Sequence, residues 1–316
     1  MAVRGLALVV AAGCNGGGPP GPVYLDAPKP LDAPDHPGAG PGGGILTELR
    51  FAICGDTRPA VIDDTPNYPT AVATQVWADV AALSPLPQFA VTTGDYQFAS
   101  TDGSEQAPQL DLYLSARAAF PNFVYPTMGN HECTGFTDSN CGPGAQDGEP
   151  PNYTVFMQKM VMPIGEANPY FIERFAAADG SWTAKLVDIA ANAWTLQQSQ
   201  WLEAALSEPT TYTFVARHEP IDATSAPGTS PSTEIIARYP LTLLITGHTH
   251  TYGHDPAYKQ IIVGNGGAPL TSDADYGYVV VVRQADATLQ VTSYDYANGP
   301  IMEQFVISAD GLEHNN

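Results

Sequence analysis

The segment LTLLITGHTH, residues 241–250, places two histidines directly after an apolar run. Such a run, ended by Gly247, is typical of a buried β-strand. His248 and His250 are two residues apart, so in an extended segment both imidazoles face the same side. The segment therefore predicts a strand whose end delivers two imidazoles to one polar site.

Four other apolar runs of the chain end in similar polar clusters. Periodic apolar segments at 68–83 and 195–206 predict helices that alternate with these apolar runs. The alternation predicts βαβ units with a buried sheet, and the second half of the chain is predicted to consist mainly of strands. The carboxyl ends of strands in such a sheet lie along one edge, where sites are built. The clusters are GDTR at 55–58, GDYQ at 94–97, GNHE at 129–132 and RHEP at 217–220. The side chains expected to converge are Asp56, Asp95, Asn130, His131, His218, His248 and His250.

Two carboxylates, an amide and several imidazoles are ligands for hard-to-borderline metal ions. They are too many for one tetrahedral ion and about enough for two ions that share a carboxylate. Such a pair of ions activates a bound water and stabilises both oxygens of a displacement at phosphorus. Taken singly, each residue also fits an ordinary structural role. Asp56 and Asp95 could be turn or helix-cap residues, and His218 could be a hydrogen-bonded histidine at a strand end. Only the joint pattern indicates a metal site.

The ordered set GD, GD, GNHE, H and GHTH resembles the calcineurin-like metallophosphoesterases, a family that includes the purple acid phosphatases, over roughly residues 50–308. The resemblance implies an α/β fold, a four-layer αββα sandwich of mixed sheets flanked by helices. It also implies two divalent or trivalent transition-metal ions, of Fe, Mn or Zn. The first ion would be held by Asp56, Asp95 and His250, and the second by Asp95 as the bridge with Asn130, His218 and His248.

The same resemblance gives His131 the role of contacting the phosphoryl group and protonating the leaving oxygen. Glu132 and Glu219 are interpreted as hydrogen-bond partners of ligands rather than as ligands. The implied reaction is phosphoester hydrolysis, of a monoester or a diester, by metal-activated water. A degenerate protein that keeps the fold and binds phosphate without turnover is the alternative, and a hydrolase of nucleotide-type substrates is a third possibility. Segments 133–168 and 221–238 are expected to shape the pocket.

Two positions depart from the family pattern. Arg58 stands where many members have a ligand histidine, and Phe98 stands where purple acid phosphatases have a ligand tyrosine. Gln97 and Tyr96 are the nearest substitutes, although strand alternation points Tyr96 away from Asp95. Arg58 either binds substrate oxygens in a bidentate fork or forms a structural ion pair. The first ion is thus expected to have three protein ligands.

The chain has 12 Lys and Arg against 33 Asp and Glu, a net charge of −21. This balance argues against nucleic-acid binding, which needs a basic surface, and against adhesion to anionic lipid. Metal ions would let so acidic a protein receive a phosphorylated small-molecule or nucleotide-type substrate. The oligomeric state is left open.

The first residues predict export. Residues 1–14 combine Arg4 with the apolar run GLALVVAA, too short to span a membrane, and AAGC resembles a bacterial lipobox with Cys14 as the lipidated residue. An ordinary secretory signal is the alternative. The predicted protein is an exported lipoprotein, periplasmic or at the cell surface, that contacts a membrane only through its lipid anchor.

The remaining boundaries follow from composition. Residues 15–48, rich in Gly and Pro, predict a flexible tether, 49–310 the folded domain and 311–316 a tail. Because an exported protein meets an oxidising compartment, Cys133 and Cys141 are expected to form a disulfide. Cys54 is expected to be a buried strand thiol.

Overall fold

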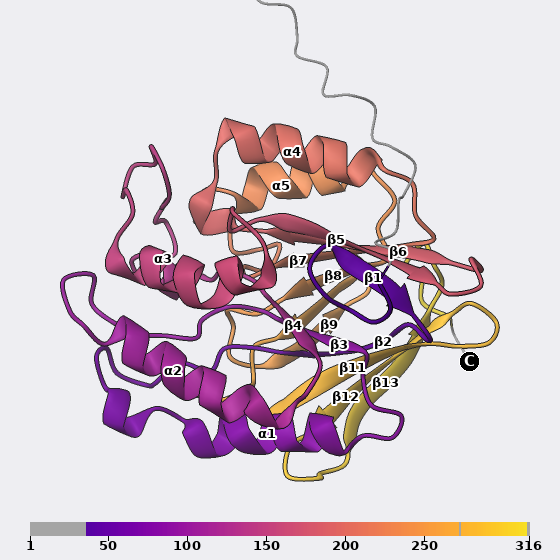
Figure 1. Ribbon diagram of the computed structural model, residues 1–316, viewed down its shortest axis with the longest axis horizontal. Helices are drawn as coiled ribbons and strands as arrows, with labels where there is room; N and C mark the ends of the chain where they lie inside the picture. Colours follow the sequence, from indigo (N-terminus) through magenta and orange to yellow (C-terminus); the bar gives the residue numbers. More distant parts are fainter. Residues whose placement is uncertain (1–35, 272, 315–316) are drawn as a thin grey trace, which may run out of the picture.

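Two mixed β-sheets form the centre of the fold in the computed structural model, which describes residues 36–271 and 273–314 (Figure 1). The six-stranded sheet has the order β13-β12-β11-β2-β3-β4, with β2, β3 and β4 parallel. Its strands are β2 (Arg50–Cys54), β3 (Phe89–Thr92), β4 (Phe123–Pro126), β11 (Gly277–Arg283), β12 (Leu289–Asp295) and β13 (Ile301–Ile307).

The seven-stranded sheet has the order β1-β5-β6-β7-β8-β10-β9. Strands β6, β7, β8 and β10 run parallel, whereas β9 and β5 pair antiparallel with their neighbours β10 and β6. Its strands are β1 (Gly43–Leu46), β5 (Phe171–Ala177), β6 (Thr183–Ile189), β7 (Tyr212–Arg217), β8 (Leu243–Thr246), β9 (Tyr252–Asp255) and β10 (Gln260–Val263).

Helices cover the outer face of each sheet (Figure 1). Helices α1 (Thr70–Ala82) and α2 (Gln106–Ala116) pack on the six-stranded sheet, and α4 (Leu196–Ser207) and α5 (Thr229–Ile236) pack on the seven-stranded sheet. The inner faces of the sheets share one apolar core, in which the Phe89 ring stacks on Phe51 from its own sheet and on Phe175 from the other. The predicted four-layer αββα sandwich is therefore confirmed.

The apolar periodicity of residues 195–206 predicts Leu196 on the inner face of α4, and the structure contradicts this. Leu196 is 74% exposed, whereas Gln198 is fully buried. The Gln198 amide donates to the carbonyls of Ala190 and Ala193 and accepts from the N–H of Ala190. A buried polar side chain is stable when its hydrogen bonds are made, and here they hold the loop that precedes the helix.

The folded part of the chain begins before residue 49. Residues 36–48, expected to belong to the flexible tether, include β1, which pairs in parallel with β5. Gly43 has φ 108°, and a Cβ on it would lie 1.7 Å from the carbonyl oxygen of Arg174. The glycines that suggested flexibility thus permit close backbone approach at the sheet edge.

The other terminus also extends the fold. Glu313 bridges to Ile307, and the N–H of His314 donates to Val306, so residues 311–314 lie against β13 instead of forming a free tail. The predicted export signal 1–14, Cys14 and residues 15–35 lie outside the described residues. Within the described ranges, no helix has the length and apolar character needed to cross a membrane.

Segment 133–168, expected to rim the site, folds as a disulfide loop followed by α3 (Pro151–Phe156), a π-helical turn and a 3₁₀ turn. Cys133 and Cys141 form the disulfide, and Cys54 is a buried free thiol in β2. Segment 221–238 contains α5, which lies beside α4 in the outer layer.

Candidate metal centre

The candidate ligands follow the carboxyl ends of strands from both sheets. Asp56, Asp95 and Asn130 follow β2, β3 and β4 of the six-stranded sheet. The three histidines follow strands of the seven-stranded sheet: His218 follows β7, and His248 and His250 follow β8. The single sheet edge expected from the sequence is therefore formed by two sheets that meet at the site.

Three of these residues have a left-handed backbone. Asp56, Asp95 and His248 have φ values of 57°, 56° and 70°, and each directly follows a glycine. This conformation is strained for residues other than glycine, and it is found at functional sites where surrounding contacts enforce it. One such contact is the His248 N–H, which donates to both carboxylate oxygens of Asp56 at 3.1 Å.

Two glycines leave room for the carboxylates. A Cβ on Gly129 would lie 2.3 Å from Asp95 Oδ1, and a Cβ on Gly247 would lie 2.4 Å from Asp56 Oδ2. Any side chain at either position would displace a candidate ligand. The glycine of each motif is thus required by close packing against the carboxylate of another motif.

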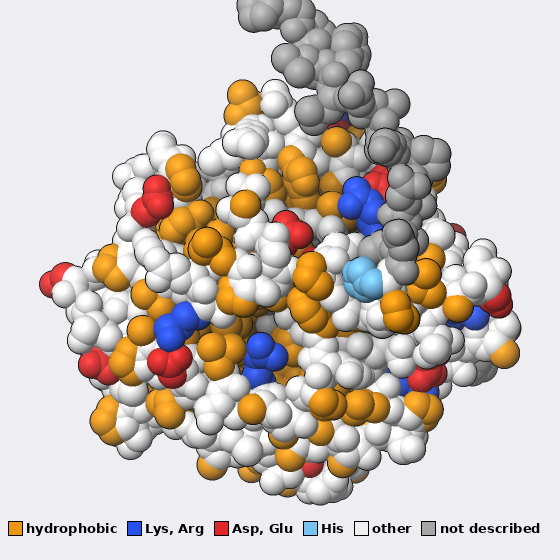
Figure 2. Space-filling model, viewed as in Figure 1, with side chains coloured by type: hydrophobic (Ala, Val, Ile, Leu, Met, Phe, Trp, Pro, Cys, Tyr) orange, Lys and Arg blue, Asp and Glu red, His pale blue; other side chains and the backbone are white. Residues whose placement is uncertain are grey.

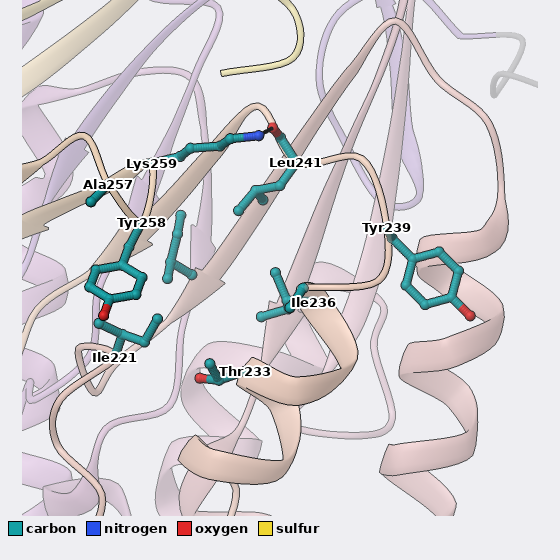
Figure 3. Close-up of a pocket in the computed structure, with 10 residues that line it drawn as sticks. Ile221, Thr233, Ile236, Tyr239, Leu241, Ala257, Tyr258 and Lys259 are labelled. Atoms are coloured by element: carbon teal, nitrogen blue, oxygen red, sulfur yellow. Dashed lines mark hydrogen bonds between the residues drawn. The ribbon is translucent and has the colours of Figure 1, made fainter. Parts of the chain in front are cut away.

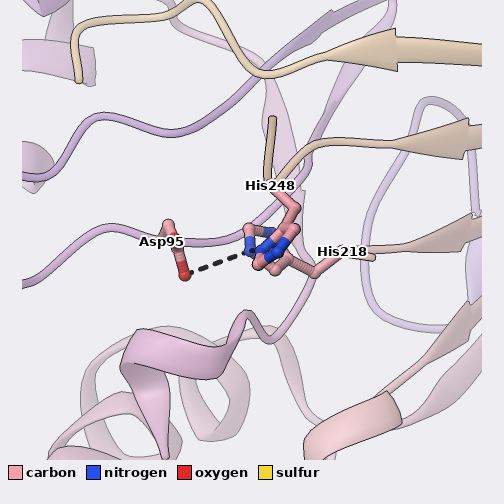
Figure 4. Close-up of side chains that lie close together, drawn as sticks. All are labelled: Asp95, His218 and His248. Carbon is pink, nitrogen blue, oxygen red and sulfur yellow. Dashed lines mark hydrogen bonds and ion pairs between the residues drawn. The ribbon is translucent and has the colours of Figure 1, made fainter. Parts of the chain in front are cut away.

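Asp95, His218 and His248 form one group of potential metal ligands, with ligand atoms within 4.8 Å of one another (Figure 4). His218 Nε2 lies 3.2 Å from Asp95 Oδ1. His248 Nδ1 lies 3.2 Å from His218 Nε2 and 3.2 Å from the amide oxygen of Asn130. Four donors, two of them imidazole nitrogens, therefore converge on one point.

Backbone contacts orient these donors. His218 Nδ1 lies 2.6 Å from the carbonyl oxygen of Thr93, which only accepts hydrogen bonds, so Nδ1 carries the proton and Nε2 faces the group. Asn130 Nδ2 donates to the carbonyl of Gly135 at 2.7 Å, which turns its oxygen toward His248. Partners of this kind are how proteins fix metal-binding side chains.

Asp56, Asp95 and His250 form the other group of potential ligands, also within 4.8 Å. His250 Nδ1 donates to the carbonyl of Pro269 at 2.7 Å, and its Nε2 lies 3.7 Å from Asp56 Oδ1. With Nδ1 protonated, a neutral His250 presents a lone pair to a carboxylate oxygen. Two such acceptors repel unless a cation lies between them, so the residues present fit a metal ion. Asp95 belongs to both groups, as a bridging ligand would.

Burial and mutual charge shift the ionisation of the whole cluster. Burial raises the pKa of Asp56 well above its ordinary value. Burial acts in the same direction on Asp95, but the charges of His218 and His131 outweigh it and hold the pKa of Asp95 well below its usual range. Burial alone would lower the pKa of His218, yet Asp95 and Asp56 raise it well above its usual value. The carboxylates therefore attract positive charge into the site, as a proton or as a metal cation.

The other two imidazoles are held neutral. Burial lowers the pKa of His248 to about 4, and burial together with the Arg58 charge lowers the pKa of His250. A neutral imidazole keeps the lone pair that a metal ion requires. His248 and His250 therefore each keep a lone pair available for a cation.

His131 and Arg58 flank the shared carboxylate. His131 Nε2 and Arg58 Nε lie 3.7 Å and 3.6 Å from Asp95 Oδ2. Phe98 contacts both, because its ring meets the His131 ring edge-on at 4.5 Å and lies 4.7 Å from the Arg58 guanidinium carbon. Burial lowers the pKa of His131 to about 3. Phe98 therefore packs between two groups that point toward Asp95.

The two substitutes considered for the missing tyrosine each donate a hydrogen bond to a backbone carbonyl outside the ligand groups. Tyr96 is fully buried and donates to the carbonyl of Thr127 at 3.0 Å, as its strand position predicts. Gln97 is also buried and donates to the carbonyl of Asn152 at 3.1 Å. Counting carboxylate, imidazole and thiol donors, the group of Asp56, Asp95 and His250 has three among the described residues.

Some functional contacts have no side-chain signal in the sequence. The carbonyls of Thr93, Pro269 and Gly135, which orient His218, His250 and Asn130, are backbone groups. Gly135 lies inside the disulfide loop, so the loop directly supports a candidate ligand.

Other surface features lie apart from the centre. An apolar pocket of about 230 Å³ beside α5 contains none of the candidate ligands, and Lys259 at its rim bonds to the carbonyl of Leu241 (Figure 3). In the view of Figure 2, charged side chains of both signs are scattered among apolar and polar ones, without a continuous basic area among the described residues.

Comparison with known structures shows the same fold in phosphatases. A purple acid phosphatase from yellow lupin (Lupinus luteus) seeds has a TM-score of 0.59 at 17% identity, covering 82% of this chain and 53% of that one. A dimetal phosphatase from Danio rerio has a TM-score of 0.56 at 12% identity, covering 83% of this chain and 99% of that one. The chain thus matches about half the length of the lupin enzyme.

Sequence comparison gives the family. No curated protein sequence matches the chain. The model of the calcineurin-like phosphoesterases matches residues 49–252, which contain every candidate ligand. The chain therefore belongs to the calcineurin-like phosphoesterase family.

Proposed function

We propose that this protein hydrolyses small phosphoesters at a centre of two transition-metal ions that share Asp95. The observation that carries the proposal is the overlap of the two ligand groups at this one carboxylate. Asp56, Asp95 and His250 would hold one ion, and Asp95, Asn130, His218 and His248 the other, of Fe, Mn or Zn. When bound, such a pair lowers the pKa of a water molecule and neutralises charge on the phosphoryl oxygens.

His131 is proposed to act on the leaving group. Its backbone N–H donates to Asp95 Oδ1 at 3.1 Å, and Phe98 packs against its ring, so the imidazole has little freedom. A neutral imidazole with Nε2 protonated donates one hydrogen bond, which we assign to the leaving oxygen. The position of His131 beside Asp95 supports its proposed role as the group that donates a proton to the leaving oxygen.

Arg58 is proposed to bind substrate. Its Nε is buried and has no hydrogen-bond partner among the described residues, and its closest acidic atom is Asp95 Oδ2 at 3.6 Å. An unpartnered guanidinium N–H beside a phosphate-binding centre suits a phosphoryl oxygen. The net charge of −21 makes such local positive groups necessary for an anionic substrate.

The natural setting is proposed from the N-terminal sequence. Residues 1–14 would direct export, and lipidation of Cys14 would attach the protein to a membrane in the periplasm or at the cell surface. Labelled palmitate given to expressing cells should mark the wild-type protein and leave a Cys14→Ser variant unmarked. Equal labelling of both proteins would refute the lipid anchor.

A substrate panel tests the enzymatic proposal. Purified protein loaded with Mn²⁺, Zn²⁺ or Fe²⁺ is assayed on an aryl phosphate, a bis-aryl phosphate and a nucleotide, with metal content measured in each sample. Turnover that depends on metal supports the proposal, and the ratio of monoester to diester rates assigns the class. Fully loaded protein that hydrolyses none of these compounds but binds phosphate would identify a non-catalytic binding protein.

A further inference from the structure

The two ligand groups differ in what they offer a cation. The group of Asp95, Asn130, His218 and His248, here called the four-donor position, has two imidazole nitrogens. The group of Asp56, Asp95 and His250, here called the three-donor position, has one. Because transition-metal affinity rises with donor number and with nitrogen ligation, the three-donor position is weaker on donor count alone.

Arg58 places a fixed positive charge beside the three-donor position. Its Nε lies 3.6 Å from Oδ2 of Asp95, whereas His218 of the four-donor position lies 3.2 Å from Oδ1. Two contacts hold the guanidinium there: the Phe98 ring at 4.7 Å from its central carbon, and a hydrogen bond from Nη1 to the carbonyl of Pro59 at 3.1 Å. An arginine stays charged at all physiological pH values, so this charge is permanent.

A cation entering the three-donor position therefore meets electrostatic repulsion. The Arg58 side chain is only 16% exposed, which limits screening by water. In the four-donor position, His218 lies 3.2 Å from Asp95 Oδ1, the oxygen that Arg58 does not contact, and this position has more donors to offset the same charge.

A phosphoryl oxyanion would offset both disadvantages of the three-donor position, its low number of donors and the repulsion by Arg58. Its negative charge would offset that of Arg58, and one oxygen could accept from the buried Nε–H, which has no partner within the described chain. A second oxygen could complete the ligand shell of a cation in the three-donor position. Cation and oxyanion would each improve the binding of the other.

We propose that the two positions fill in a fixed order: the four-donor position binds its ion alone, and the three-donor position binds its ion together with a phosphoryl oxyanion, with Arg58 imposing the order. The inference rests on the proposed function, since it takes the same centre as given. It adds that the complete centre forms when an anionic phosphoester is present.

Equilibrium dialysis of the purified full chain against Mn²⁺ tests the order directly. Bound Mn²⁺ is counted with and without inorganic phosphate, and free Mn²⁺ is read by its electron paramagnetic resonance signal. The expected result is about one tightly bound ion per chain without phosphate and about two with it. Reciprocally, the affinity for phosphate should rise by the same factor as the affinity for the second ion.

Variants of Arg58 separate charge from shape. Arg58→Gln removes the charge, so the second Mn²⁺ should bind at least tenfold more tightly without phosphate, and the effect of phosphate should shrink. Arg58→Lys retains the charge and should retain the order. Arg50→Gln, at the opposite end of β2 and paired with Glu48, controls for loss of one positive charge elsewhere. Circular dichroism confirms that each variant is folded.

The outcomes distinguish this inference from the proposed function. Wild-type protein that binds two ions tightly without phosphate, or an Arg58→Gln variant with unchanged second-ion affinity, overturns the ordered filling and leaves the enzyme proposal intact. Protein that binds no Mn²⁺ under either condition overturns both. Phosphate-dependent loading of two ions in a protein that hydrolyses no phosphoester supports the order and overturns only the enzyme proposal.

Discussion

Glu132 Oε2 accepts the backbone N–H of Asp95 at 2.8 Å, so the carboxylate of one motif holds the ligand of another. The same oxygen accepts the N–H of Gly129 at 2.9 Å, and Oε1 accepts the N–H of Tyr96 at 2.9 Å. One buried side chain thus fixes the strained turn after β3 relative to the turn after β4. The relative positions of Asp95 and Asn130 depend on it.

Glu132→Gln should weaken metal binding without removing a ligand. The amide nitrogen of glutamine cannot accept, so at least one backbone N–H loses its partner and the turns shift. Loss of a side chain that orients ligands typically costs 10- to 100-fold in metal affinity, and we expect a decrease of about that size. Competition with a chelator measures it. Glu149→Gln, which changes an exposed glutamate of the same segment, should leave affinity unchanged.

His131→Ala should lower turnover by about 10²- to 10⁴-fold while metal content stays constant. If His131 assists the leaving oxygen, the loss should be larger for an alkyl phosphate than for 4-nitrophenyl phosphate, whose leaving group needs little help. Steady-state rates on both substrates, with metal analysis, give the comparison. His254→Ala, a histidine stacked on Phe305 outside the ligand groups, is the matched control. Equal losses on both substrates would contradict the leaving-group role.

Glu173→Gln should make the protein more stable near neutral pH. Glu173 lies fully buried in β5 and accepts no side-chain hydrogen bond in the described chain. Burial raises the pKa of Glu173 from 4.5 to about 9. The folded state therefore keeps a proton that the unfolded chain has lost, and stability falls as pH rises from about 4.5 to about 9.

Over that window each pH unit lowers the free energy of unfolding by about 1.4 kcal/mol at most. Urea unfolding at pH 5 and pH 7 should show a decrease for the wild type that is about 2 kcal/mol larger than for Glu173→Gln. Because Glu173→Gln retains every other titrating group, the difference between the two proteins isolates the contribution of Glu173. A wild type and variant with parallel pH dependence would show that Glu173 ionises normally.

Lys185→Met should destabilise the fold by about 2–4 kcal/mol. The buried Lys185 ammonium donates to the carbonyls of Ala205, Leu206 and Glu208, at the end of α4. Methionine fills the space but leaves these carbonyls without a donor. Lys159→Met removes only an exposed pair with Asp111 and should cost less than about 1 kcal/mol. Urea unfolding of both variants tests the difference; equal effects would exclude the capping role.

The ligands and the fold class were predictable because each motif is local. A glycine followed by a metal-binding side chain at a strand end is visible in a few residues, as in Gly247-His248. Strand pairing is not local, so the sequence did not show that His218 and Asp95 approach from different sheets. Composition was misleading at Gly43, where glycine serves close packing rather than flexibility. The carbonyls of Thr93 and Pro269 carry no residue-specific signal at all.

The division of ligands between the sheets has a consequence for how metal specificity arises. The six-stranded sheet supplies the oxygen donors, Asp56, Asp95 and Asn130, and the seven-stranded sheet supplies the nitrogen donors, all histidines. During synthesis the three oxygen donors emerge first, and oxygen ligands alone favour calcium or magnesium over transition metals. A donor set that combines oxygen and imidazole nitrogen exists only where the two sheets meet, so preference for a transition metal depends on the contact between the sheets as well as on the ligand residues.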